Sequence, residues 1–68
     1  MQKSIGSIIK ELRTERGMTQ TELAQRLHIT TQAISKWENG LSMPDVALLV
    51  PLADAFGVSI DVLFGRNK

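Results

Sequence analysis

The 68-residue sequence predicts an all-α fold, and three observations carry that prediction. First, apolar residues near the start recur at the spacing of one helical face: Ile5, Ile8, Ile9 and Leu12. Second, Thr19 followed three residues later by Glu22 is a capping box, the signature of a helix start. Third, no segment shows the strict alternation of apolar and polar residues that is typical of a half-buried strand.

The length predicts one domain over residues 1–68, with an ordered core at 3–64 and a short basic tail at 65–68. A domain of this size buries only about 60% of the surface that its unfolded chain exposes, so its core must be efficient. The chain has no cysteine, which excludes disulfides and favours a reducing cytoplasm. It has one histidine and dispersed acids, so neither a metal site nor a cofactor is predicted.

No targeting or membrane segment is expected. The N-terminal stretch MQKSIGSIIKELR lacks both the uninterrupted apolar region and the small-residue cleavage site of a signal peptide. The longest nearly apolar run, residues 46–53, is far shorter than the roughly 20 residues that a membrane-spanning helix needs. The sequence therefore predicts a cytoplasmic protein.

The charges are unevenly distributed along the chain. Residues 1–36 contain six basic and three acidic residues, whereas residues 37–65 contain four acids and no base. Arg66 and Lys68 then follow. This asymmetry is compatible with a nucleic-acid-facing surface in the first half of the chain. An ordinary mixed, solvated surface explains the charges equally well when they are taken alone.

The first helix is predicted over residues 4–15, and Gly17 ends it. Gly6 lies inside this helix, where glycine costs nearly 1 kcal/mol relative to alanine. Two explanations fit such a residue. Either the end of the helix frays there, or a neighbouring helix approaches so closely that no side chain fits.

Two further short helices follow, over residues 20–27 and 31–39. Thr19 and Thr30 are their N-caps, and Gly40 is the stop of the second. Two such helices joined by three or four residues predict a helix-turn-helix. His28 lies in the turn, where a positive φ is usually required and histidine is one of the enriched exceptions to glycine. We interpret it as a turn residue, with phosphate binding or pH sensing as the alternatives.

The third helix carries one polar face without an acid. Ile34 and Trp37 are predicted to be buried, and Trp37 is interpreted as a core residue rather than a platform for stacking bases. The other positions form a hydrogen-bonding surface: Thr31, Gln32, Ser35, Lys36 and Asn39. Glu38 lies away from that surface, toward the first helix, where Arg13 is its expected partner.

Pro51 predicts an interruption in the fourth helical region. Its nitrogen has no hydrogen to donate to Ala47, its ring presses on that carbonyl, and the residue before a proline favours extended geometry. We therefore expect a short turn over 46–49, after the approach and N-cap Pro44-Asp45, and then a helix over 51–56.

Gly57 ends that helix, and Ser59 is the expected cap of a last short helix over 60–64. The apolar residues of this half complete the predicted core: Leu48, Leu49, Leu52, Phe56, Val58, Ile60 and Leu63. The segment 58–64 can serve the core, a subunit interface, or both.

The stretch TQTELAQRLHITTQAISKWENG, residues 19–40, resembles the helix-turn-helix of the Cro/repressor-type (XRE) family. LRTERG before it and PDVALLVPLADAFGVSIDVLF after it extend the resemblance over nearly the whole chain, from about residue 5 to residue 64. It implies a compact five-helix domain whose second and third helices form the motif. The third helix would enter the DNA major groove. His28 departs from the family's usual small turn residue.

Carried over residue by residue, the resemblance implies DNA contacts from polar residues of the motif and of the loop after it: Gln20, Thr30, Thr31, Gln32, Ser35, Lys36, Asn39 and Ser42. Gln20 would bind a phosphate from the start of its helix. The base-reading positions of the family are occupied here by Thr31, Gln32 and Lys36. Thr30, Ser35 and Asn39 would contact both phosphates and bases, and the loop Leu41-Ser42 would reach a further phosphate. Arg13 and Glu38 match an ion pair that braces the first helix against the third, although a surface pair worth ~0 to 1 kcal/mol remains the alternative.

The chemistry of these side chains agrees with base recognition. Glutamine can bind adenine bidentately, lysine can donate to guanine, and a threonine methyl group can touch the methyl group of thymine. Each good bidentate match gives roughly 1 to 3 kcal/mol of discrimination between bases.

The predicted function is therefore a sequence-specific DNA-binding transcriptional regulator, a repressor that binds double-stranded DNA as a homodimer. Two half-sites about 34 Å apart on a palindromic operator would combine two small contact areas. The alternative is a protein-interaction module, such as an antitoxin-like or anti-repressor subunit with the same fold. An enzyme is not expected, because Ser, His and Asp candidates are dispersed among caps and turns and no Gly-rich phosphate loop is present. No small-molecule ligand is predicted.

Overall fold

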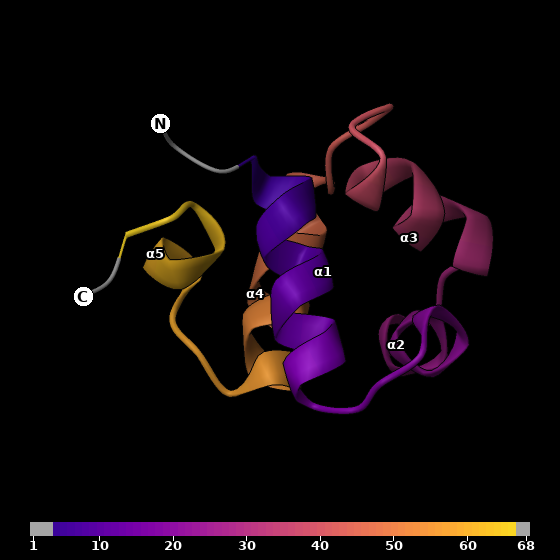
Figure 1. Cartoon of the computed structure of the whole chain (residues 1–68), viewed down its shortest axis with the longest axis horizontal. Coiled ribbons are helices and arrows are strands. Elements are labelled where there is room, and N and C mark those ends of the chain that lie inside the picture. Colours follow the sequence, from indigo (N-terminus) through magenta and orange to yellow (C-terminus); the bar gives the residue numbers. More distant parts are fainter. Residues whose placement is uncertain (1–3, 67–68) are drawn as a thin grey trace.

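The computed structural model describes residues 4–66, which form five helices and no strand. The helices are α1 (Ile5–Glu15), α2 (Gln20–Leu27), α3 (Thr31–Glu38), α4 (Val46–Phe56) and α5 (Ile60–Leu63), and Figure 1 shows their arrangement. The predicted all-α fold is confirmed. Residues 1–3 and 67–68 lie outside the described part, so the first residue of the predicted core and half of the predicted basic tail are not included.

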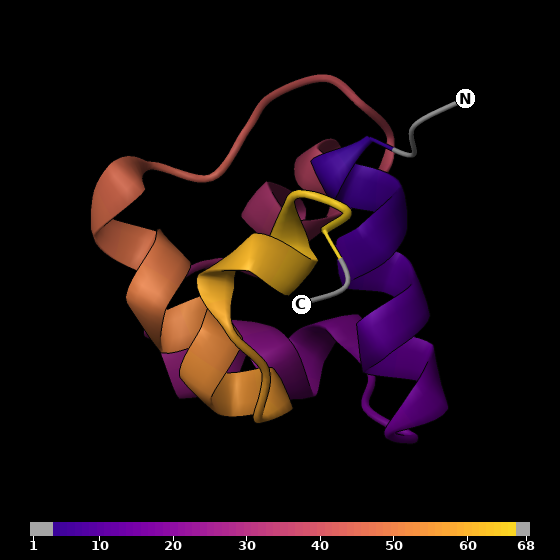
Figure 2. The same ribbon diagram turned by 90° about the vertical axis from the view of Figure 1, so that its left-hand side faces the viewer.

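All five helices contribute to one core. α3 packs against α1 and α2, α4 packs against α2 and α5, and α5 also contacts α1. In Figure 2, α5 lies between α4 and α1. The buried hydrophobic residues are Ile8, Ile9, Leu23, Ala24, Leu27, Ile34, Trp37, Leu52, Ala53, Phe56 and Leu63. Trp37 is only 4% exposed, so its predicted place in the core is confirmed.

α1 and α3 approach each other closely at Gly6. A Cβ atom added there would lie 1.8 Å from the backbone oxygen of Trp37. The start of α1 is capped, because the Ser4 hydroxyl accepts a hydrogen bond from the Ser7 amide at 3.1 Å. Gly6 is therefore the point of close approach and not part of a frayed end.

α4 corrects the sequence prediction. It is one continuous helix from Val46 to Phe56 with Pro51 inside it, so the predicted break before Pro51 was wrong. Ala47 and Pro51 are both exposed, so the Ala47 carbonyl that loses its helical partner can bind water. The helix gains the burial of Leu52 and Phe56 in return. Tertiary packing therefore outweighs the local cost of the proline.

α5 is shorter than predicted and ends at Leu63. Leu63 is fully buried, whereas Phe64 is 44% exposed. Ser59 is the N-cap position of α5, but its side chain makes no capping hydrogen bond, and neither does that of Asp45, the N-cap of α4. Among residues 4–66, no helix is both long enough and apolar enough to span a membrane.

Candidate nucleic-acid interface

The helix-turn-helix is held by side-chain caps at the start of both of its helices. The Thr19 hydroxyl accepts from the Glu22 amide at 3.0 Å, and the Glu22 carboxylate accepts from the Thr19 amide at 2.8 Å. The predicted capping box is thus confirmed. At the start of α3, the Thr30 hydroxyl accepts from the Ala33 amide at 3.2 Å. These caps fix the directions in which α2 and α3 leave the turn.

His28 makes the turn between the two helices. Its φ of 59° and ψ of 41° place it in the left-handed region, and it is the only non-glycine residue with positive φ within residues 4–66. The next amide, of Ile29, donates to the Ala24 carbonyl at 3.0 Å and so satisfies a carbonyl at the end of α2. The interpretation of His28 as a turn residue is confirmed.

The polar residues of α3 occupy one continuous arc of the helix. At 100° per residue, positions 31, 32, 35, 36 and 39 span about 140° and leave the buried Ile34 and Trp37 on the other side. Gln32 and Lys36 are exposed, and Thr31 and Ser35 are half-buried. α3 itself ends at Glu38, with Asn39 as its C-cap, one residue earlier than predicted.

Hydrogen bonds within the protein divide this arc into two kinds of residue. Asn39 Nδ2 donates to Ser35 Oγ at 3.3 Å, and Thr31 Oγ1 lies 3.5 Å from Thr21 Oγ1. Within residues 4–66 the structure gives no hydrogen bond to the side chain of Gln32 or Lys36. These two side chains are the ones whose full hydrogen-bonding capacity faces outward.

The two remaining candidates lie at the edges of this surface. Gln20 is the first residue of α2 and is half-buried, and its Nε2 donates to Glu38 Oε1 at 3.0 Å. Ser42 is exposed in the connection between α3 and α4. The fold thus places Gln20 next to the end of α3, while Ser42 follows α3 along the chain.

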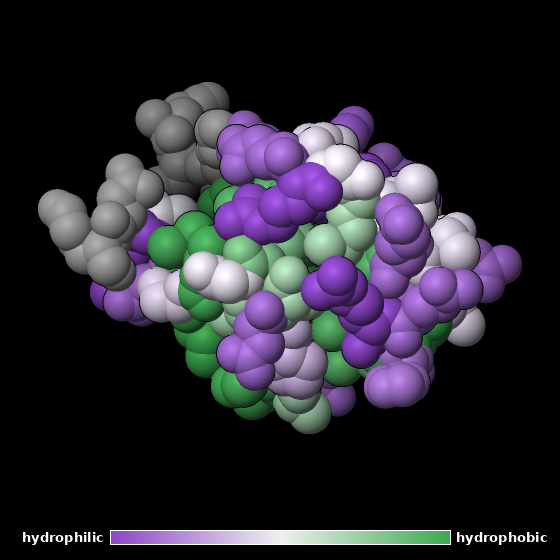
Figure 3. All heavy atoms as spheres, turned by 90° about the horizontal axis from the view of Figure 1, so that it is seen from below, coloured by the Kyte–Doolittle hydropathy of each residue, from purple (hydrophilic) through white to green (hydrophobic). Residues whose placement is uncertain are grey.

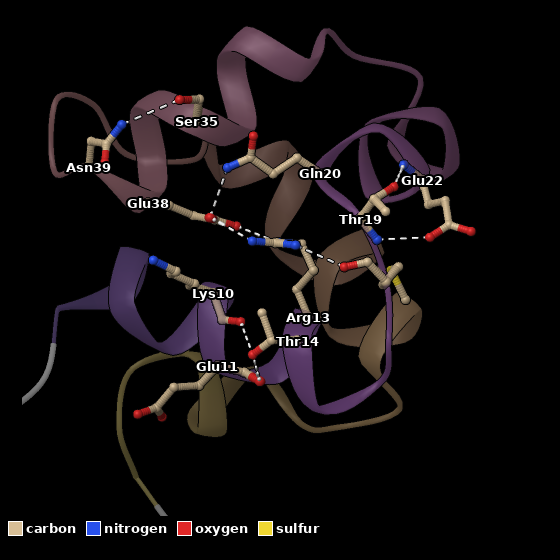
Figure 4. Close-up of polar contacts among 11 residues, drawn as sticks. Lys10, Glu11, Arg13, Thr14, Thr19, Gln20, Glu22, Ser35, Glu38 and Asn39 are labelled. Atoms are coloured by element: carbon tan, nitrogen blue, oxygen red, sulfur yellow. Dashed lines mark hydrogen bonds and ion pairs between the residues drawn. The ribbon is translucent and has the colours of Figure 1, made fainter.

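The expected pair of Arg13 and Glu38 is present and is more than a surface ion pair. Arg13 Nε and Nη2 donate to the two oxygens of Glu38 at 2.7 and 3.0 Å, and Nη1 donates to the Met18 carbonyl at 2.8 Å. The two side chains are only 11% and 4% exposed. Figure 4 shows Glu38 between Arg13 of α1 and Gln20 of α2, so one carboxylate connects three helices.

The environment of Glu38 lowers the pKa of its carboxyl group. Burial acts to raise that pKa, but hydrogen bonds from Arg13 and Gln20 and the charges of Arg13 and Lys10 outweigh it. Glu38 is therefore ionised at neutral pH. The contact between Gln20 and Glu38 was not predicted, because 18 residues separate the two and no local pattern indicates such a contact.

Not every basic residue of the first half is available to a partner. Arg13 is bound to Glu38, and Arg16 donates to the carbonyls of Phe56 and Leu12 at 2.8 and 3.0 Å. The Arg16 guanidinium also lies 5.7 Å from the centre of the Phe56 ring. Two of the cations that make the sequence asymmetric therefore stabilise the fold. Three exposed ones remain among the described residues of that half: Lys10, Arg26 and Lys36.

Comparison with known proteins agrees with this geometry. A helix-turn-helix family model matches residues 9–63. The chain is 40% identical over 60 residues to the HTH-type transcriptional activator BcrR of Enterococcus faecalis, covering 88% of this chain and 29% of that protein. It is 35% identical over 65 residues to the HTH-type transcriptional regulator ImmR of Bacillus subtilis, covering 96% of this chain and 51% of that protein. The chain thus spans about half or less of the length of these relatives.

The fold also matches a crystal structure of the P22 c2 repressor protein in complex with a synthetic operator. The TM-score is 0.88 at 26% sequence identity, and the match covers 96% of this chain and 98% of that one. The matched family model spans all of α2 and α3, the two capped helices with the left-handed turn between them. On this evidence the chain belongs to the Cro/repressor-type (XRE) helix-turn-helix family of transcription regulators.

Proposed function

We propose that this chain binds double-stranded DNA in a sequence-specific manner, with α3 in the major groove, and represses transcription from a palindromic operator as a homodimer in the cytoplasm. The observation that carries the proposal is the acid-free arc of α3, where Gln32 and Lys36 are exposed without an internal partner. An α-helix fits the major groove, and base edges there distinguish all four base pairs. The P22 c2 repressor structure with its synthetic operator supports this function by analogy.

Within this proposal, three side chains of α3 read bases. Gln32 binds adenine bidentately, Lys36 donates to guanine, and Thr31 offers its methyl group to thymine. Ser35 and Asn39 hydrogen-bond each other at 3.3 Å and so enter the groove as a pair with restricted geometry.

Phosphate contacts fix the position of the domain on the duplex. Gln20 and Thr30 lie at the N-terminal ends of α2 and α3, where free amides and the positive end of the helix dipole favour an anion. Ser42 offers a hydroxyl group from the following connection. Such contacts orient the protein and carry no sequence information of their own.

The dimer is proposed from an exposed apolar surface. Five large hydrophobic residues lie in the α3–α4 connection, on α4 and after α5 with 44% to 79% of their surface exposed: Leu41, Met43, Val46, Val50 and Phe64. In Figure 3, hydrophobic residues gather mainly in the lower left part of this face, with hydrophilic side chains among and around them. Pairing with a second copy would remove this area from water. Sedimentation of the wild type and of V50E on palindromic DNA tests this dimer. Equal masses of the two protein–DNA complexes would contradict it.

Selection of binding sites from a random DNA pool tests the proposal directly. A palindromic consensus is expected. Gln32→Ala and Lys36→Ala should each relax the preference at one position by roughly 1 to 3 kcal/mol, whereas Gln20→Ala should weaken all sequences alike. Gln25→Ala is the matched control, because Gln25 is an exposed glutamine of α2 outside the proposed surface.

Salt dependence distinguishes DNA binding from the protein-interaction alternative. Neutralising phosphates releases counterions, so affinity for DNA should fall steeply with added salt. If Lys36 also neutralises a phosphate, Lys36→Ala should reduce the slope of log affinity against log salt concentration by about one. If no duplex is enriched and weak binding shows neither sequence preference nor this slope, the domain acts as a protein-interaction module instead.

A further inference from the structure

The hydrogen bond between Gln20 and Glu38 connects the proposed phosphate contact with the interior of the fold. Gln20 Nε2 donates to Glu38 Oε1 at 3.0 Å. The Glu38 side chain is 4% exposed and receives two hydrogen bonds from Arg13 as well. Figure 4 shows the side chains of Gln20 and Arg13 converging on the Glu38 carboxylate. A residue of the candidate surface is thus held by a group that itself is inaccessible to DNA.

An ionised carboxylate determines which end of an amide side chain faces it. A carboxylate can only accept hydrogen bonds, and an amide carries two donor hydrogens on its nitrogen and an acceptor oxygen. Facing Glu38, Gln20 must therefore turn its nitrogen inward. One hydrogen of Nε2 is used by Glu38, and the second remains free to donate. A phosphate needs such a donor and would be repelled by the amide oxygen.

We propose that Glu38 is a positioning residue for DNA binding: its carboxylate fixes the orientation of the Gln20 amide so that the free N–H points at a backbone phosphate. This inference rests on the proposed function, because it concerns how the same surface holds DNA. Glu38 acts through Gln20 and makes no DNA contact of its own.

Arg13 makes this arrangement compatible with a polyanion. A lone carboxylate near the DNA backbone would repel phosphates, but the bidentate pairing with Arg13 at 2.7 and 3.0 Å neutralises it. The third contact of Arg13, to the Met18 carbonyl at 2.8 Å, fixes the segment that leads directly into α2. The position of Gln20 and the orientation of its amide are thus set by one connected network.

A double-mutant cycle tests the inference. Glu38→Gln preserves the shape of the side chain and an acceptor for Arg13, but its amide group can also donate, which allows the Gln20 amide to rotate by half a turn. Affinity for the selected operator is measured for the wild type, Q20A, E38Q and the double variant. We expect Q20A to weaken binding about tenfold, because it removes one hydrogen bond to a charged group. E38Q should weaken it several-fold in the wild-type background and not at all in the Q20A background.

Glu15→Gln is the matched control for charge. Glu15 is exposed on α1, and its substitution removes one negative charge without touching Gln20. It should tighten binding slightly, in every background. Additive effects of Q20A and E38Q would show that Glu38 supports the fold and does not orient Gln20. Tighter binding by E38Q would overturn the inference as well.

A measurement on the unmodified protein keeps the test valid if E38Q does not fold. In the ¹H–¹⁵N spectrum, one Nε2 proton of Gln20 should be slowed in exchange by the carboxylate before DNA is added, and operator DNA should shift mainly the other proton. If both protons exchange alike in the free protein, the inference fails. If the first proton is slowed but no DNA binds, the proposed function fails while the contact itself stands.

Discussion

Substitution of Gly6 by alanine tests the close approach of α1 and α3. The added Cβ would lie 1.8 Å from the backbone oxygen of Trp37 and 2.8 Å from its carbonyl carbon, roughly 1.6 Å and 0.6 Å inside the 3.4 Å at which ordinary contact begins. The obstructing atoms belong to the backbone, so no side-chain rotation relieves the overlap. The two helices must separate, which displaces Trp37 from its position in the core.

The expected loss follows from two opposing terms. Overpacking costs typically 1 to 3 kcal/mol, and we expect about 3 to 4 kcal/mol here because backbone must move, while alanine gains about 1 kcal/mol of helix propensity over glycine. A net loss of about 2 to 3 kcal/mol is expected, a large share of the roughly 3 to 10 kcal/mol available to 68 residues. With a urea m-value of about 1 kcal/mol/M, the unfolding midpoint should fall by about 2 to 3 M.

Fluorescence of Trp37, the single tryptophan, reports the transition during urea titration. Ser7→Ala is the control, since Ser7 is exposed in the same helix and its substitution should stay within about 0.5 kcal/mol. A midpoint for G6A equal to or above that of the wild type would refute the description of the contact between α1 and α3.

Three further predictions concern the turn, the cap and the buried carboxylate. His28→Gly should raise the free energy of unfolding by about 0.5 kcal/mol in the same titration. Left-handed backbone costs a non-glycine residue about 1 to 2 kcal/mol, and part of the gain from glycine is lost in backbone entropy. A lower midpoint would contradict strain at the turn. Thr19→Ala should remove about 1 kcal/mol by deleting the capping bond to Glu22, and an unchanged midpoint would mean that water replaces that bond at no cost. Since the pKa of Glu38 is lower in the folded state, its contribution to stability is complete above the ordinary carboxyl value of 4.5 and is lost as the pH falls from there through the lower folded pKa. Urea titrations along a pH series should show this loss, and Glu38→Gln should weaken it; an identical acid dependence in both proteins would exclude Glu38 as a source.

Local signals predicted most of the fold because they have local physical causes. The capping box at Thr19, the left-handed residue His28 and the stop at Gly57 each depend on atoms within a few residues, so their sequence signatures suffice. Pro51 is the counterexample. Its local cost was correctly identified, but the burial of Leu52 and Phe56 against other helices decides the outcome, and those contacts are not encoded in a short window.

The candidate surface also contains features that local sequence signals predict and features that depend on distant contacts. The acid-free arc of α3 follows from helical spacing alone, and the structure leaves that arc in place. The hydrogen bond from Gln20 to Glu38 joins the start of one helix to the end of the next, and only the crossing of α2 and α3 brings them together. Similarly, Arg16 is one of the six basic residues counted in residues 1–36, and the sequence does not indicate that the fold places it on the end of α4.

Exposed residues of the α3 arc and residues of the buried network around Glu38 differ in the properties that their substitution should change. The side chains of Gln32 and Lys36 make no hydrogen bond within residues 4–66, so substitutions there should change base preference at almost constant stability. Glu38 serves the packing of three helices and, by our inference, the orientation of Gln20, so its substitution should change stability and affinity together. By our proposal, such a domain can acquire a new operator by exchanging exposed residues of α3, because the network of Arg13, Glu38 and Gln20 does not include Gln32 or Lys36.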